Sequence, residues 1–181
     1  MEANPVRIVQ YFDGEKQSII PLFQRPYTWG KRNWQTLWDD IKWYYDENDP
    51  NSSHFMGAIV SIPAKTVPVG VTKHLVIDGQ QRLTTVAILL CSLRDTVDEK
   101  KSAQIQDYLV NRHYDESADY LKLMPTQGDR NAYLTIVRGN SDKDSGKHSI
   151  HDCYEYFKKK LIEKDDDEKL IDPEKILEVV K

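Results

Sequence analysis

The chain has 181 residues and a mass of 21.1 kDa, enough for one well-packed domain or for one domain plus part of a second. Its net charge of -4 argues against a protein that coats DNA through a broad basic surface, so any contact with nucleic acid should be local. A mean hydropathy of -0.65 excludes a membrane span, and the N-terminus lacks the cationic start and the apolar stretch of a signal peptide, so we expect a cytoplasmic protein without membrane contact.

The first elements along the chain are a short strand, an aromatic loop and a helix. Residues 17–22 form the predicted strand, which stops near Pro21 because proline cannot donate to a sheet. Residues 23–29 follow as an extended loop. Apolar residues at helical spacing then predict a helix over residues 31–46.

Two strands are predicted next. Residues 55–62 are an apolar, β-branched run suited to a central strand, and Gly57 within it indicates a bulge or a close approach of two backbones. A second strand at residues 71–77 should pair antiparallel with the first, because the connection is short enough for a hairpin.

The rest of the chain is mainly helical. The most apolar helix follows the second strand, runs to about Val97 and should be the central one. Further segments follow from the spacing of apolar residues: helices at 102–114, 129–137, 150–161 and from Pro173 onward, and a strand at 120–124. The sequence therefore predicts an α/β (α+β) fold, with a small mixed sheet packed with several helices.

A stretch rich in Gly, Ser and Asp suggests how the chain is divided. We place a linker at residues 139–149, between a domain at residues 1–138 and a helical region that starts at residue 150 and continues to residue 181. Because the last helix is still apolar where the sequence stops, we expect this region to be truncated or to need a partner.

The junction between the strand at 71–77 and the central helix is a candidate anion site. Backbone N–H groups and the positive end of the helix dipole point out of such a turn. Gly79 permits the turn, Gln80 and Gln81 offer amides, Arg82 offers a fork for phosphate, and Asp78 can orient a metal-bound water. The alternative is an ordinary turn in which Asp78 caps the helix.

Two other stretches are candidates for the same chemistry. The loop Gln24–Trp29 can stack a ring on its aromatic residues while Arg25 holds a phosphate, although Tyr27 and Trp29 can equally pack against the next helix. The pair Asp129 and Arg130 can complete a phosphate pocket or cap its own helix.

Together, residues 24–29, 55–60 and 77–85 resemble the ParB/sulfiredoxin-like N-terminal domain of the GmrSD-type restriction endonucleases, which the phosphorothioate-sensing antiphage nuclease SspE also carries. The resemblance covers residues 19–137. It implies a ParB-like fold whose Asp-Gly-Gln-Gln-Arg motif binds and hydrolyses a nucleoside triphosphate, in proteins that recognise modified phage DNA. A separate His-Asn-His nuclease domain cuts the DNA in that family, and no such constellation follows Lys147 here, so we do not expect this chain to cut DNA alone.

The resemblance also assigns roles to single residues. It implies catalytic roles for Asp78, Gln81 and Arg82; nucleotide contacts from Gly79, Gln80, Thr84, Thr85 and Arg25; and DNA sensing by Gln24, Tyr27 and Trp29. Asp78 would also be a ligand of Mg²⁺.

The implied ligands and partners are equally specific. The nucleotide is expected to be GTP or UTP rather than ATP, bound with Mg²⁺. The expected partners are phosphorothioated or glucosylated DNA and a His-Asn-His nuclease domain or subunit. Whether the chain also forms a homo-oligomer is left open.

Two alternative functions use the same residues. In one, the chain is a non-enzymatic DNA-binding module of ParB type, whose turn grips a backbone phosphate. In the other, it is a toxin-like or scaffolding protein that acts through a partner docked on the last helix.

Overall fold

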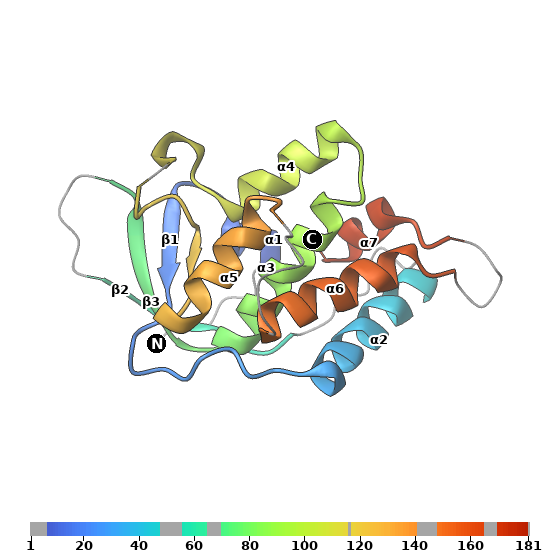
Figure 1. Ribbon diagram of the computed structural model, residues 1–181, viewed down its shortest axis with the longest axis horizontal. Coiled ribbons are helices and arrows are strands. Elements are labelled where there is room, and N and C mark those ends of the chain that lie inside the picture. Colours follow the sequence, from blue (N-terminus) through green and yellow to red (C-terminus); the bar gives the residue numbers. More distant parts are fainter. Residues whose placement is uncertain are drawn as a thin grey trace.

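The computed structural model describes residues 7–47, 56–64, 70–115, 117–140, 148–164 and 170–180. Within these ranges seven α-helices pack with a four-stranded mixed sheet, which confirms the predicted α/β class. The sheet forms one end of the molecule and helices α2 (Lys31–Glu47), α6 (Ser149–Ile162) and α7 (Pro173–Val180) form the other (Figure 1).

The sheet has the strand order β2-β3-β1-β4. Strand β1 (Lys16–Ile19) is an inner strand and runs parallel to both β3 (Thr72–Asp78) and β4 (Leu123–Met124). Strand β2 (Val60–Pro63) runs antiparallel to β3, which confirms the predicted antiparallel pair. The carboxyl end of β3 therefore leads directly into the candidate anion site.

The prediction of a central strand at residues 55–62 is wrong. Strand β2 begins only at Val60, lies at the edge of the sheet, and is mostly exposed. Gly57 has a φ of +95°, which interrupts extended backbone before the strand, and Pro63 cannot donate a ladder hydrogen bond, which suits an edge. Phe55 lies outside the described residues.

Helix α3 (Gln80–Arg94) is the centre of the molecule, as predicted, although it ends slightly before Val97. Every residue from Leu83 to Arg94 is buried, because α4 (Glu99–Leu109), α5 (Gln127–Val137) and α6 all pack around it. Burying one large apolar side chain contributes about 1.5–3 kcal/mol. This helix is thus a rigid base for whatever its first turn holds.

The apolar face of α7 is covered within the chain. Ile176 and Leu177 are buried, and the helix packs against α2, so the expectation that this face needs a partner is wrong. Phe157 of α6 and Ile176 of α7 belong to the same hydrophobic cluster as Leu89 of α3. The predicted linker at residues 139–149 therefore does not separate two cores.

The remaining differences from the predicted elements are local. Helix α4 begins at Glu99, earlier than predicted, because the Asp98 side chain caps it by accepting a hydrogen bond from the Lys101 N–H. A 3₁₀ turn, η1 (Arg112–Tyr114), is separate from this helix, and α1 (Ile8–Phe12) was not predicted. No helix in the described ranges is long and apolar enough to cross a membrane.

Candidate functional site

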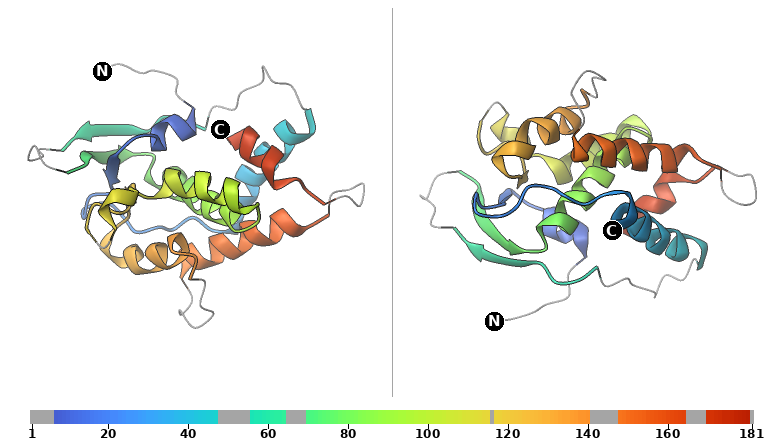
Figure 2. Two further views of the ribbon diagram at one scale, coloured as in Figure 1. Left: turned by 90° about the horizontal axis from the view of Figure 1, so that it is seen from above. Right: turned by 60° about the horizontal axis from the view of Figure 1, so that its bottom comes forward.

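Residues 24–29, here called the strap, join β1 to α2 and cross the first turn of α3 (Figure 2, right). The side chain of Gln81 fastens this crossing. Its Nε2 donates to the Pro26 carbonyl at 3.0 Å, and its Oε1 accepts from the N–H groups of Thr28 at 2.9 Å and Trp29 at 3.3 Å. The buried side-chain amide of Gln81 therefore forms hydrogen bonds to the backbone of the strap, as the backbone of a neighbouring strand would.

Two further glutamines hold the start of the strap. Gln24 Nε2 donates to the Ile77 carbonyl at 3.0 Å, and Gln80 Nε2 donates to the Arg25 carbonyl at 3.4 Å. The Oε1 atom of Gln80 is buried and has no hydrogen-bond partner among the described residues. A buried acceptor without a hydrogen-bond partner costs free energy. The first turn of α3 thus carries an unsatisfied polar atom beside the strap.

Tyr27 inserts from the strap into the core and is only 6% exposed. Its hydroxyl lies 2.7 Å from Thr85 Oγ1 and accepts from Trp34 Nε1 at 2.8 Å, and it donates to Cys153 Sγ at 3.3 Å. Burial raises the pKa of Tyr27 far above its ordinary value, so the phenol stays neutral. This position favours the alternative in which Tyr27 packs rather than faces a ligand.

The buried carboxylate of Asp129 anchors the strap to α5. Its Oδ2 accepts from the Tyr27 N–H at 2.8 Å and from Thr126 Oγ1 at 2.6 Å. Nε2 of His148 lies 3.5 Å from the other carboxylate oxygen. Asp129 is 3% exposed, so it joins elements inside the fold and does not complete a phosphate pocket on the surface.

The first turn of α3 has no side-chain cap. Gly79 occupies the N-cap position in the left-handed region, with a φ of +89°, and no side chain of the described residues accepts a hydrogen bond at this cap. The alternative in which Asp78 caps the helix is therefore wrong, and the Asp78 side chain is 73% exposed instead. The first helical bond runs from the Leu83 N–H to the Gly79 carbonyl, so the N–H groups before it point out of the helix.

Arg82 turns its guanidinium toward the segment that leads into β2. Nη1 donates to the Met56 carbonyl at 3.2 Å and Nη2 donates to the Ala58 carbonyl at 2.6 Å, while Asp78 Oδ2 lies 4.0 Å away. Gly57 lies between the two carbonyls, and a Cβ atom on it would be 1.8 Å from Nη1. The close neighbour of Gly57 is therefore the Arg82 side chain and not the second backbone that was predicted.

The structure thus brings the predicted site residues together around the first turn of α3 and the strap, but at different depths. Asp78 and Arg25 are exposed, and Arg82, Gln24 and Trp29 are partly exposed. The buried members are Gly79, Gln80, Gln81, Thr84, Thr85 and Tyr27. The roles of all these residues in binding, catalysis and DNA sensing stay predictions.

The sequence did not predict the role of several residues that shape the site. Asp129, Trp34 and Cys153 hold the strap although they lie far from it in the chain. The spacing Thr126-x-x-Asp129 was a usable signal, because a Ser or Thr followed three residues later by an acid marks a helix start. Nothing local pointed to the other two residues.

A magnesium ion at this site would have few protein ligands. Among the described residues there is no group of three or more His, Cys, Asp or Glu that could hold a metal. Mg²⁺ at phosphate sites usually takes one or two carboxylates, with water and substrate phosphates as its other ligands. The exposed carboxylate of Asp78 fits that pattern.

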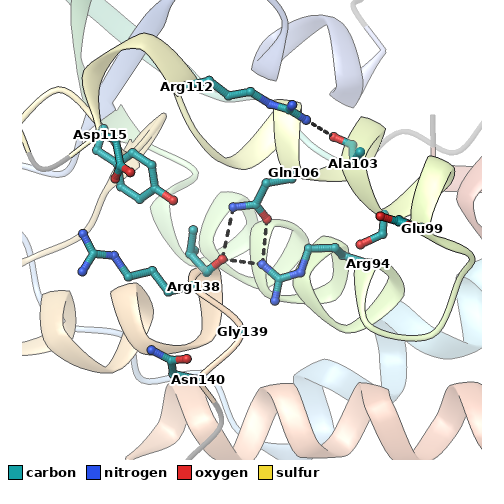
Figure 3. A pocket seen from close by; sticks show the side chains of 12 residues that line it. Arg94, Glu99, Ala103, Gln106, Arg112, Asp115, Arg138, Gly139 and Asn140 are labelled. Carbon is teal, nitrogen blue, oxygen red and sulfur yellow. Dashed lines mark hydrogen bonds between the residues drawn. The ribbon is translucent and has the colours of Figure 1, made fainter.

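A separate cavity of about 720 Å³ lies between α4, η1 and the C-terminal end of α5 (Figure 3). None of the predicted site residues lines it. Its arginines already bind other parts of the protein: Arg94 donates to carbonyls at the end of α5, Arg112 donates to the Ala103 carbonyl at 2.6 Å, and the guanidinium of Arg138 lies 5.5 Å from the ring centroid of Tyr120. These contacts join α3 to α5, η1 to α4, and the end of α5 to Tyr120.

Comparison with protein families gives a match that covers most of the chain. The model of the family described as "GmrSD restriction endonuclease, N-terminal domain" matches residues 8–181, which include the whole site and also helices α6 and α7. Comparison with curated proteins finds no match.

Proposed function

Because the chain belongs to the family of GmrSD restriction endonuclease N-terminal domains, we propose that it binds and hydrolyses a nucleoside triphosphate and thereby controls the cleavage of modified DNA. Membership makes it a domain of a DNA-acting restriction system that includes a nuclease domain. The nucleotide, its hydrolysis and the modification of the DNA are our proposal.

The uncapped start of α3 is the observation that carries this proposal. Outward N–H groups and the helix dipole favour an anion there, and Gly79 at the N-cap adds no side chain of its own. The exposed Arg25 lies at the same turn, since its carbonyl is bonded to Gln80. A polyphosphate fits this combination better than a single carboxylate does, because two arginines at different depths can each hold one phosphate.

In the proposed reaction, water attacks the terminal phosphorus and the bond from that phosphorus to the bridging oxygen breaks. The products are inorganic phosphate and a nucleoside diphosphate. Such transfer depends mainly on positioning and on stabilising charge. Arg82 and Arg25 would supply positive charge to the phosphates. Asp78 would hold Mg²⁺, which neutralises phosphate charge when bound, and Gln81 would act through the strap by positioning Arg25.

The proposed sensor responds to DNA that carries phosphorothioate linkages or glucosylated bases, with Gln24 and Trp29 as the partly exposed strap residues nearest to such a ligand. GTP and UTP are the preferred nucleotides in this proposal. The cutting is assigned to a His-Asn-His nuclease domain or subunit.

A second function rests on the same turn. The outward N–H groups of α3 also suit a DNA backbone phosphate, which would make the chain a non-enzymatic DNA-binding module. The two functions differ in whether any nucleotide is consumed.

Phosphate release separates them. The chain is incubated with GTP, UTP, CTP or ATP, with and without phosphorothioated or glucosylated DNA. Release from GTP or UTP that modified DNA stimulates supports the proposal, and DNA binding without release from any nucleotide supports the module.

An arginine variant then tests the location of the site. Arg25→Ala removes one exposed charged contact, so release should fall about 10- to 100-fold. Lys100→Ala removes an exposed positive charge from α4 and should leave release unchanged. Equal release by wild type and Arg25→Ala would place the nucleotide elsewhere.

A further inference from the structure

The two hydrogen bonds from Arg82 to the carbonyls of Met56 and Ala58 form a clamp on the segment 56–59. This segment has no regular secondary structure and leads directly into the edge strand β2. Both carbonyls are neutral acceptors, and both are held by the terminal nitrogens of one guanidinium. These are the nitrogens that a phosphate would use for a two-pronged contact.

Gly57 makes the clamp possible. Its φ of +95° turns the carbonyls on either side of it toward α3, and the guanidinium occupies the space where a Cβ atom would stand. Any other residue at this position would push the Arg82 side chain away, so the clamp depends on a glycine.

The space beside the clamp is too small for a phosphate. It measures about 10 Å³ and is lined by residues that include Met56, Gly57, Ile59 and Arg82. A cavity needs at least about 10–15 Å³ of such space to hold one water molecule, which is smaller than a phosphate. A phosphate therefore cannot enter between the guanidinium and the two carbonyls, and Arg82 can meet it only by turning toward the exposed side, where Asp78 lies.

We propose that nucleotide binding opens this clamp: the phosphate draws the Arg82 guanidinium away from the carbonyls of Met56 and Ala58 and so releases the segment that leads into β2. The inference rests on the proposed function, since it takes the ligand to be a nucleoside triphosphate at the start of α3. A phosphate competes well because it is an anion that can accept a two-pronged contact from the guanidinium, whereas the two carbonyls are neutral.

Release would be confined to one edge of the molecule. Among the described strands, β2 pairs only with β3, so no second strand there holds it when the clamp opens. Its residues Ser61, Ile62 and Pro63 are exposed. Nucleotide binding would thus make an exposed edge strand less ordered, at a distance from the bound phosphates.

Hydrogen exchange tests the release directly. Calorimetry first identifies a nucleotide that binds, and amide exchange of residues 58–62 is then compared with and without it. Loss of about one net hydrogen bond should make these amides exchange about fivefold faster in the complex. Binding with unchanged or slower exchange would overturn the inference alone, whereas no binding of any of the four nucleotides would overturn the proposed function with it.

Two glycine variants provide a matched pair. Gly57→Ala forces Arg82 out of the clamp, so exchange at residues 58–62 should already be fast without nucleotide and rise little when nucleotide is added. Gly14→Ala carries the same kind of backbone strain, with a φ of +76°, but meets nothing within 4 Å and should exchange at these residues like wild type.

A third variant covers the case in which Gly57→Ala does not fold. Arg82→Lys keeps the positive charge but lacks the fork that spans the two carbonyls, so exchange without nucleotide should again be faster than in wild type. Wild-type slow exchange without nucleotide, in folded Gly57→Ala or in Arg82→Lys, would show that the clamp does not order this segment.

Discussion

The hydroxyl of Tyr27 is the point at which the strap meets three helices. It bonds to Trp34 of α2, Thr85 of α3 and Cys153 of α6, all inside the core. The polar atoms of this group are satisfied by one another, so the loss of one leaves others unpaired. A buried donor without an acceptor costs more than the bond that it lost.

Replacing Tyr27 with Phe should therefore lower the free energy of unfolding by about 1–3 kcal/mol, mainly because the Trp34 indole N–H loses its acceptor. Urea denaturation measures the change. Tyr108→Phe, which alters a half-buried tyrosine of α4, should change stability by less than about 0.5 kcal/mol. Equal losses in the two variants would show that the Tyr27 hydroxyl has no special role.

Arg82 has a second predicted effect, on turnover. If it stabilises charge on the transferred phosphoryl group, Arg82→Ala should reduce phosphate release by about 1000-fold or more. Because the side chain is 29% exposed and its two hydrogen bonds go to a segment without regular secondary structure, the variant should still fold, as circular dichroism would show. Wild-type release by a folded Arg82→Ala protein would remove Arg82 from the reaction.

At the scale of elements, periodicity was a good guide where packing is local. The apolar spacing predicted α2 and α6 closely, because each buries a face that repeats along the helix, and it predicted α3, which is apolar enough to be buried on all sides. It missed α1, whose 5 residues are too few to show a repeat. It also placed residues 55–62 at the centre of the sheet, because an apolar run alone does not reveal whether a strand has one neighbour or two.

The candidate site was predictable only in part. The motifs named residues that do lie together at the first turn of α3. Their anchors were not, because the bonds from Tyr27 to Asp129 and from Arg82 to Ala58 join separate stretches and leave no local pattern. Asp78 was considered as the helix cap because aspartate is a common N-cap residue. In the structure the N-cap position is occupied by Gly79.

Helix α7 offers a prediction about an element. Ile176 is fully buried between α7 and the rest of the core, so Ile176→Ala should cost about 2–5 kcal/mol of stability. Glu174→Ala, also in α7, removes an exposed contact with Lys101 of α4 and should cost less than about 1 kcal/mol. Stability is measured by thermal or urea unfolding. Equal losses of stability in the two variants would mean that α7 is not part of the core in solution.

For the molecule as a whole, the buried tyrosines predict how stability depends on pH. Burial raises the pKa of Tyr27 and Tyr133 well above the ordinary value of 10, and it raises the pKa of Cys91 to about 12. The folded state keeps these protons where the unfolded state releases them. Stability is therefore fully present at neutral pH and is lost as the pH rises above the unfolded values.

Each buried tyrosine should contribute a loss of about 1.4 kcal/mol per pH unit above pH 10. Urea midpoints measured between pH 8 and 11.5 test this slope. Tyr133→Phe is the informative variant: the Tyr133 hydroxyl has no hydrogen-bond partner within the described part of the chain, so its removal should be harmless at pH 8 and should flatten the alkaline slope. A slope that is the same in both proteins would contradict this account.

The strand order has a consequence for how the protein is made. Strand β1 lies near the start of the chain and is an inner strand, yet its neighbours are β3, which starts at Thr72, and β4, which starts at Leu123. Both partner strands are synthesised well after β1, so the edges of β1 stay unpaired while most of the domain is synthesised. Slow translation at low temperature, or a chaperone that shields this strand, should therefore raise the yield of folded protein more than it would for a sheet built from successive hairpins.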